Sequence, residues 1–167
     1  MTSTTNVHSP DAALSPGSPP RDAQDINTND VRRFVYTWFT LFEHRAPAAH
    51  LAAHLTTKQP LSLTFPGTEP LREVQQFIDW YEQLLANTRW NFHELSHLTV
   101  DGADDGAYNV AVDIDWQGGV TEDSAWPTNL PDRRFRFAVH QQWRVAVDSG
   151  SAQDNPFSIV SLVAEPR

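Results

Sequence analysis

The stretch RRFRFAVHQQWRVAV, residues 133–147, alternates between apolar and polar side chains along almost its whole length. One of its two sides carries Phe135, Phe137, Val139, Gln141, Trp143, Val145 and Val147. Successive side chains of a strand point to opposite faces, so this pattern predicts a long strand with one buried and one solvated face. We therefore expect a fold built around a large antiparallel sheet, in which the amide of Gln141 on the apolar side needs an explanation.

Helical spacing dominates the chain before residue 90. Apolar residues within 31–42 recur three or four positions apart and predict a first helix. Asn29 or Asp30 suits its N-cap, and the pattern ends near Arg45. Pro47 suits the first turn of a second, shorter helix.

A short strand and a third helix complete this half of the chain. LSLTF, residues 61–65, alternates like a strand, and Pro66 and Gly67 break the chain after it. Residues 71–85 then carry the apolar stripe of a third helix. The expected order is helix, helix, short strand, helix.

Period-two patterns return after residue 90. Residues 90–100 and 107–117 alternate and are joined by the turn DGADDG, which predicts a hairpin. Residues 157–165, FSIVSLVAE, predict a last strand. The sequence therefore predicts an α+β fold in which three N-terminal helices pack on a mainly antiparallel sheet.

The chain has 167 residues, with 12 Lys and Arg against 21 Asp and Glu, and a net charge of −9. This acidic balance repels phosphate backbones, so we expect no nucleic-acid partner. Cysteine is absent, which excludes thiolate nucleophiles and cysteine metal sites. No segment approaches the roughly 18 apolar residues that span a bilayer and no signal-peptide pattern is present, so we expect a cytoplasmic protein without membrane contact.

Domain boundaries follow from composition. Residues 1–29 hold four prolines among Ser, Thr, Asp and Asn, with few large apolar residues. Such a segment cannot offset the entropy of ordering, so we predict a disordered leader over 1–29 and one domain over 30–167.

The order of elements over about residues 30–165 resembles the nuclear transport factor 2-like superfamily, as does the strand-Pro-Gly-helix passage LTFPGTEPLREVQQFIDWY. The superfamily includes SnoaL-like polyketide cyclases and ketosteroid isomerases. The resemblance implies a cone-shaped, cystatin-like α+β barrel, in which a strongly curved sheet wraps the helices and leaves a hydrophobic pocket on its concave side. Gln141 is then explained as a polar group that lines this pocket.

Other apolar faces are interrupted in the same way, by Glu94 and Ser96 in residues 90–100 and by Ser161 in the last strand. Together with Gln141 and Tyr81 of the third helix, they form the expected polar cluster. We assign Glu94 as general acid or base, because an apolar pocket raises a carboxyl pKa. Tyr81 and Gln141 would hold a developing oxyanion. The alternative is a bulge that turns Glu94 to solvent and puts Leu95 inside.

The expected ligand-binding wall is mainly aromatic: Trp38, Phe65, Trp90, Trp116 and Trp143, with His54 at the pocket mouth. His93 and His97 lie about 13 Å apart in an extended strand, too far to share a metal ion. They are read as outer-face histidines, unless a bulge brings one inward. His50 and His54 have helical spacing without a nearby third ligand, so we predict no metal, and the absence of a glycine-rich phosphate loop predicts no cofactor.

Two functions from different classes remain. The first is a SnoaL-like acid/base enzyme of isomerase, dehydratase, cyclase or hydrolase type that acts on a small apolar or aromatic carbonyl compound. The second is a non-catalytic ligand-binding or dimerisation module. On the outer sheet face, Asp113 and Asp115 lie opposite a strand that carries Arg134, Arg136, His140 and Arg144, which suggests charge pairs across strands. The resemblance implies a homodimer through this face, and the alternative is that the face is charged and solvated. The segment 118–132 is either a lid or an extended hairpin tip.

Overall fold

The structure is a computed structural model that describes residues 26–148 and 155–167. Its elements are α1 (Thr28–Glu43), α2 (Ala48–Ala52), β1 (Ser62–Thr64), α3 (Val74–Asn87), β2 (Thr88–Gly102), β3 (Tyr108–Val120), β4 (Arg134–Val147) and β5 (Phe157–Pro166). The strands form one sheet in the order β1-β5-β4-β3-β2. All neighbours are antiparallel except β1, which runs parallel to β5. The predicted α+β fold is confirmed.

Helix α1 begins earlier than predicted. The side chain of Asn27 accepts a hydrogen bond from the backbone N–H of Asn29 at 2.9 Å, and the Asp30 carboxylate accepts from the N–H of Asn27 at 3.1 Å. Asn27 is therefore the N-cap and Asp30 its reciprocal partner in a capping box. Of the predicted leader, residues 1–25 lie outside the described residues, while Thr28 and Asn29 belong to α1.

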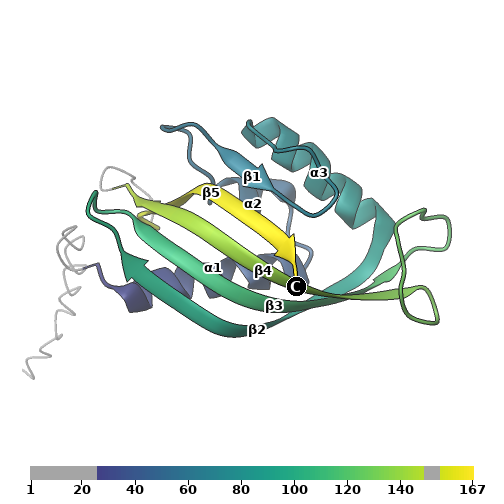
Figure 1. Cartoon of the computed structure of the whole chain (residues 1–167). Coiled ribbons are helices and arrows are strands. Elements are labelled where there is room, and N and C mark those ends of the chain that lie inside the picture. Colours follow the sequence, from purple (N-terminus) through teal and green to yellow (C-terminus); the bar gives the residue numbers. More distant parts are fainter. Residues whose placement is uncertain (1–25, 149–154) are drawn as a thin grey trace, which may run out of the picture.

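The long strands β2 to β5 curve around α1, and α3 and β1 lie together above them in the view of Figure 1. Helix α1 contributes a buried stripe that includes Trp38, which is 1% exposed. The ring of Trp38 lies 5.6 Å from Phe77 of α3 and 6.1 Å from Trp143 of β4, measured between centroids. This side chain of α1 therefore packs against both α3 and the sheet. In the described part of the chain, no helix is long and apolar enough to cross a membrane.

Strand β2 changes phase at a bulge. The pairing with β3 shifts between Ser96 and Thr99, and His97 between them has a φ of 51°. One extra residue in a strand moves every following side chain to the opposite face. Before the bulge, odd-numbered residues such as Asn91 face inward, and after it even-numbered residues such as Val100 do.

Strand β5 has a similar irregularity. Its pairing with β4 shifts between Arg144 and Val145, whose partners are Ser161 and Ile159. Ile159 is buried before the shift, and Leu162 is buried after it. Ser161 consequently lies on the face away from the core, which corrects the prediction that it points inward.

Charged side chains on the outer sheet face pair across strands, as the sequence suggests. His140 lies 2.8 Å from Asp113 and Arg167 lies 2.8 Å from the same carboxylate, while Arg136 pairs with Asp115. The hydrogen bond with His140 holds the pKa of Asp113 below its usual value. These pairs are largely exposed, so each adds little stability.

Candidate functional site

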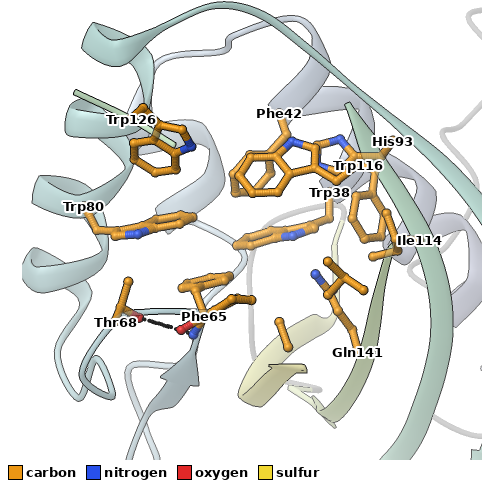
Figure 2. A pocket seen from close by; sticks show the side chains of 14 residues that line it. Trp38, Phe42, Phe65, Thr68, Trp80, His93, Ile114, Trp116, Trp126 and Gln141 are labelled. Carbon is orange, nitrogen blue, oxygen red and sulfur yellow. Dashed lines mark hydrogen bonds between the residues drawn. The ribbon is translucent and has the colours of Figure 1, made fainter. Parts of the chain in front are cut away.

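A cavity of about 70 Å³ opens between the concave face of the sheet and the helices. Side chains from α1, α3, the turn after β1, the loop after β3 and strands β2 to β5 line it (Figure 2). Its wall is dominated by the rings of Trp38, Phe39, Phe42, Phe65, Trp80, His93, Trp116 and Trp126. Such a wall suits a small, mostly apolar ligand.

One side of the cavity is a stacked pair of rings. Phe65 and Trp80 lie with centroids 4.0 Å apart and planes 4° from parallel. Figure 2 shows both rings on the same side of the cavity. The turn that carries Phe65 is closed by Thr68, whose hydroxyl donates to the Phe65 carbonyl at 3.0 Å. The stacked pair is therefore held by local contacts and is formed before any ligand enters.

The loop after β3 brings Trp126 to the cavity. The hydroxyl of Ser124 donates to the side-chain oxygen of Asn87 in α3 at 2.8 Å, and accepts from the backbone N–H of Trp126 at 3.0 Å. The guanidinium of Arg133 donates to the carbonyls of Thr121 and Ser124 at 2.8 and 2.7 Å. Between the two alternatives for segment 118–132, these contacts favour a loop that covers part of the cavity.

His93 is the most polar group buried in the wall. Its side chain is 9% exposed, and its ring lies parallel to that of Trp116 with centroids 5.9 Å apart. Burial lowers the pKa of His93 to about 3, because removing water disfavours the charged imidazolium. The imidazole is therefore neutral at ordinary pH.

Glu43, at the end of α1, lies beside this histidine. Its Oε1 accepts a hydrogen bond from the backbone N–H of His93 at 2.9 Å and lies 3.8 Å from the ring Nδ1. The second distance is too long for a hydrogen bond, so the neutral ring and the carboxylate are neighbours without a direct bond. A small shift of the ring would bring the two groups into contact.

Gln141 on β4 is the polar group on the facing wall. It is 9% exposed, and its Oε1 accepts a hydrogen bond from the indole Nε1 of Trp143 at 2.9 Å. Figure 2 shows the amide nitrogen on the side of Trp38. Within residues 26–148 and 155–167, that nitrogen has no hydrogen-bond partner.

Two other polar atoms of the wall are buried without a partner among the described residues, Nδ1 of His93 and Nε1 of Trp116. A buried polar atom that lacks a hydrogen bond costs about 1–3 kcal/mol. Such atoms are expected where a bound molecule supplies the missing partner.

No protein-family model matches the sequence, and no curated protein matches it. Solved structures do match. A candidate dehydratase of the NTF2-like family from Streptomyces avermitilis gives a TM-score of 0.66 at 15% identity, over 83% of this chain and 95% of that one. The hexachlorocyclohexane dehydrochlorinase LinA-type3 from Novosphingobium barchaimii gives 0.64 at 11% identity, over 83% and 85%. Aln2 from a Streptomyces species gives 0.60 at 12% identity, over 83% and 89%.

The chain has the nuclear transport factor 2-like fold. At these identities the matches establish the fold, and the cavity of this NTF2-like chain has to be judged from its own residues. Four of the predicted site residues line it: Trp38, Phe65, Trp116 and Gln141. Trp143 does not line it, but it holds the amide of Gln141 from behind.

Glu94 and Ser96 do not reach the cavity. Both are exposed, because the bulge at His97 puts odd-numbered residues inside in the first half of β2. Trp90 is turned outward for the same reason and is 42% exposed. The structure therefore corrects the predicted inward positions of all three residues and agrees with the alternative in which Leu95 lies inside.

Tyr81 and His54 are close to the cavity but do not line it. Tyr81 is fully buried, its hydroxyl donates to the Ala46 carbonyl at 2.9 Å, and burial raises its pKa to about 12. His54 lies behind Trp38, 6.1 Å from that ring, and its Nδ1 contacts the His50 carbonyl at 2.9 Å. The Tyr81 hydroxyl links α3 to the segment just before α2 and does not line the cavity, so it is not positioned to hold an oxyanion there.

The sequence patterns do not identify His93, Trp80 or Trp126 as wall residues. The available signal for His93 was the irregularity at Leu95, an apolar residue on the otherwise polar side of its strand. In the part of the chain that the structure describes, no group of three or more His, Cys, Asp or Glu side chains could hold a metal ion.

Proposed function

We propose that this protein binds a small, mostly apolar or aromatic carbonyl compound in the cavity and catalyses proton transfer there. The observation that carries the proposal is a neutral, buried imidazole, His93, that lines an aromatic cavity next to the carboxylate of Glu43. His93 takes the role of general base that the pattern of β2 suggests for Glu94. Two of the similar structures bear the names dehydratase and dehydrochlorinase, and eliminations of that kind remove a proton from carbon.

The proposed step uses three groups. A lone pair of the His93 ring takes a proton from the carbon next to the ligand carbonyl, while the C–H electron pair forms a carbon–carbon double bond and the negative charge moves to the oxygen. Glu43, 3.8 Å from Nδ1, stabilises the imidazolium that results. The amide nitrogen of Gln141 donates to the developing oxyanion. The surrounding rings keep out water, which strengthens both interactions.

The test is deuterium exchange at carbon. Wild-type protein is incubated with 1-tetralone and related bicyclic ketones in D₂O, and loss of the α-proton signal is followed by NMR. We expect exchange faster than in buffer, and a decrease of about 100-fold or more in His93→Gln, since a positioned base contributes at least that factor. His50→Gln, which removes an exposed histidine of α2 and leaves the bulge of β2 intact, should leave the rate unchanged.

A non-catalytic ligand-binding module is the second candidate. The specific observation that favours it is the pKa of His93, because a base with a pKa of about 3 is weak unless the ligand or Glu43 raises that value. Binding of the ketones without exchange above the buffer rate would support the module and contradict the enzyme.

We also propose a homodimer through the outer face of the sheet, and a cytoplasmic location. Trp90 and Phe92 are 42% and 47% exposed on that face of β2. Trp90 lies against β3, where a Cβ added at Gly119 would come within 2.5 Å of its Nε1. Two neighbouring exposed aromatic rings are typical of interface anchors.

Light scattering after size-exclusion chromatography tests the dimer. Wild-type protein should have twice the mass of one chain. The double variant Trp90→Ser/Phe92→Ser should weaken dimerisation by about 30-fold or more, because the loss of even one aromatic anchor costs about 2 kcal/mol. Tyr36→Ser, which removes an exposed ring from α1, is the control and should remain dimeric. A monomeric wild type would reject the proposal.

A further inference from the structure

We propose that Trp143 fixes the amide of Gln141 as a hydrogen-bond donor toward the cavity, and that the cavity therefore selects ligands that carry an acceptor oxygen. This inference rests on the proposed function and deepens it, because it names the polar feature of the substrate and a residue outside the cavity that determines it. Trp143 is a positioning residue that acts through Gln141.

The orientation of the amide follows from the chemistry of its partner. An indole N–H can donate a hydrogen bond but cannot accept one. The atom of Gln141 that lies 2.9 Å from Trp143 Nε1 is therefore the oxygen, and the NH₂ group is left on the other side. Gln141 thus presents its NH₂ group, and not its oxygen, to the cavity.

Reversal of the amide is unfavourable because the pair is buried. Trp143 is 3% exposed and packs against Trp38 and Phe39, with ring centroids 6.1 and 5.7 Å away. A flipped Gln141 would put its NH₂ group against the indole N–H and leave both donors unpaired. An unpaired buried donor reduces the population of the flipped form by roughly 5- to 150-fold.

The other unpaired atoms of the wall point to the same ligand chemistry. Nε1 of Trp116 is a buried donor without a partner among the described residues. At Gln141 and Trp116 the wall offers donors, which a ligand with an acceptor oxygen satisfies and a ligand N–H group does not. The neutral ring of His93 adds one acceptor nitrogen elsewhere in the wall.

The first part of the test needs no ligand. In ¹⁵N-labelled protein, the indole N–H signal of Trp143, identified by its loss in Trp143→Phe, should exchange with solvent at least about 10-fold more slowly than that of free tryptophan. In Gln141→Leu it should shift upfield and exchange faster. Exchange of the Trp143 signal as fast as that of free tryptophan, or no response to Gln141→Leu, would overturn the positioning role.

The second part compares three bicyclic probes of similar shape: 1-tetralone with an acceptor oxygen, tetralin with no polar group, and 5,6,7,8-tetrahydro-1-naphthylamine with a donor nitrogen. Wild-type protein should bind the ketone about 10-fold more tightly than the other two, as measured by tryptophan fluorescence or calorimetry. Trp143→Phe frees the amide to rotate, so the preference for the ketone over the amine should fall to about 3-fold or less.

The outcomes separate this inference from the proposed function. An unchanged ketone preference in a folded Trp143→Phe variant, or equal affinities in the wild type, overturns the selectivity even if exchange at carbon is catalysed. Binding selectivity without catalysis overturns the enzyme and leaves the inference standing. Failure of all three probes to bind overturns the ligand cavity, and the selectivity with it.

Discussion

Replacing Trp38 with alanine is expected to lower the free energy of unfolding by about 3–5 kcal/mol. The ring is 1% exposed and lies between α1, α3 and β4, with Phe42, Phe77 and Trp143 around it. Its removal leaves an empty space. The surrounding side chains belong to three different elements and cannot move together to fill it. Urea denaturation followed by circular dichroism measures the change, which is a large fraction of the roughly 5–15 kcal/mol that stabilises a domain.

Tyr36→Ala is the control for this prediction. An aromatic ring of the same helix is removed, but from a position that is 52% exposed, so the loss should stay within about 1 kcal/mol. A similarly small loss in Trp38→Ala would contradict the prediction and would mean that the cavity wall is deformable. A large loss would mean that the wall is preformed, and that ligands bind without reordering it.

The position of Gln141 could be derived from the sequence because nothing disturbs the alternation before it. Strand β4 keeps one phase from Phe135 to Trp143, and its register with β3 is continuous over that stretch. A polar residue at an inward position of such a strand has to face the core or a cavity. The three helices could also be predicted from the sequence, because their apolar stripes are long and the segments between them contain Pro and Gly.

The inward position of His93, the proposed base, could not be derived in this way. Because of the bulge at His97, the first half of β2 turns the opposite set of side chains toward the core. Asn91 and His93 face inward, whereas unbroken alternation predicts that Glu94 does. A bulge is set by pairing with another strand and by a left-handed residue, neither of which a period-two pattern records. The loop that brings in Trp126 depends on a contact between Ser124 and Asn87, which are 37 residues apart.

Acid should destabilise the wild-type protein through His93. The pKa of the ring is 6.5 in an unfolded chain and about 3 in the folded one, so between these values only the unfolded state binds the proton. The contribution of His93 to the free energy of unfolding is therefore greatest above pH 6.5. It decreases by about 1.4 kcal/mol per pH unit as the pH drops toward 3. The total is on the order of 5 kcal/mol.

His93→Gln isolates this contribution. Burial also lowers the pKa of His54, and the effect of that group is common to both proteins. Asp113 and Asp115 have pKa values below their usual 3.8 owing to hydrogen bonds with His140 and Arg136, so their stabilisation is lost only at lower pH. Between about pH 6 and 4 the variant should therefore show a slope smaller by nearly 1.4 kcal/mol per unit. Equal slopes would mean that Glu43 stabilises a protonated ring in the folded state, and His93 would then be the stronger base that proton transfer at carbon requires.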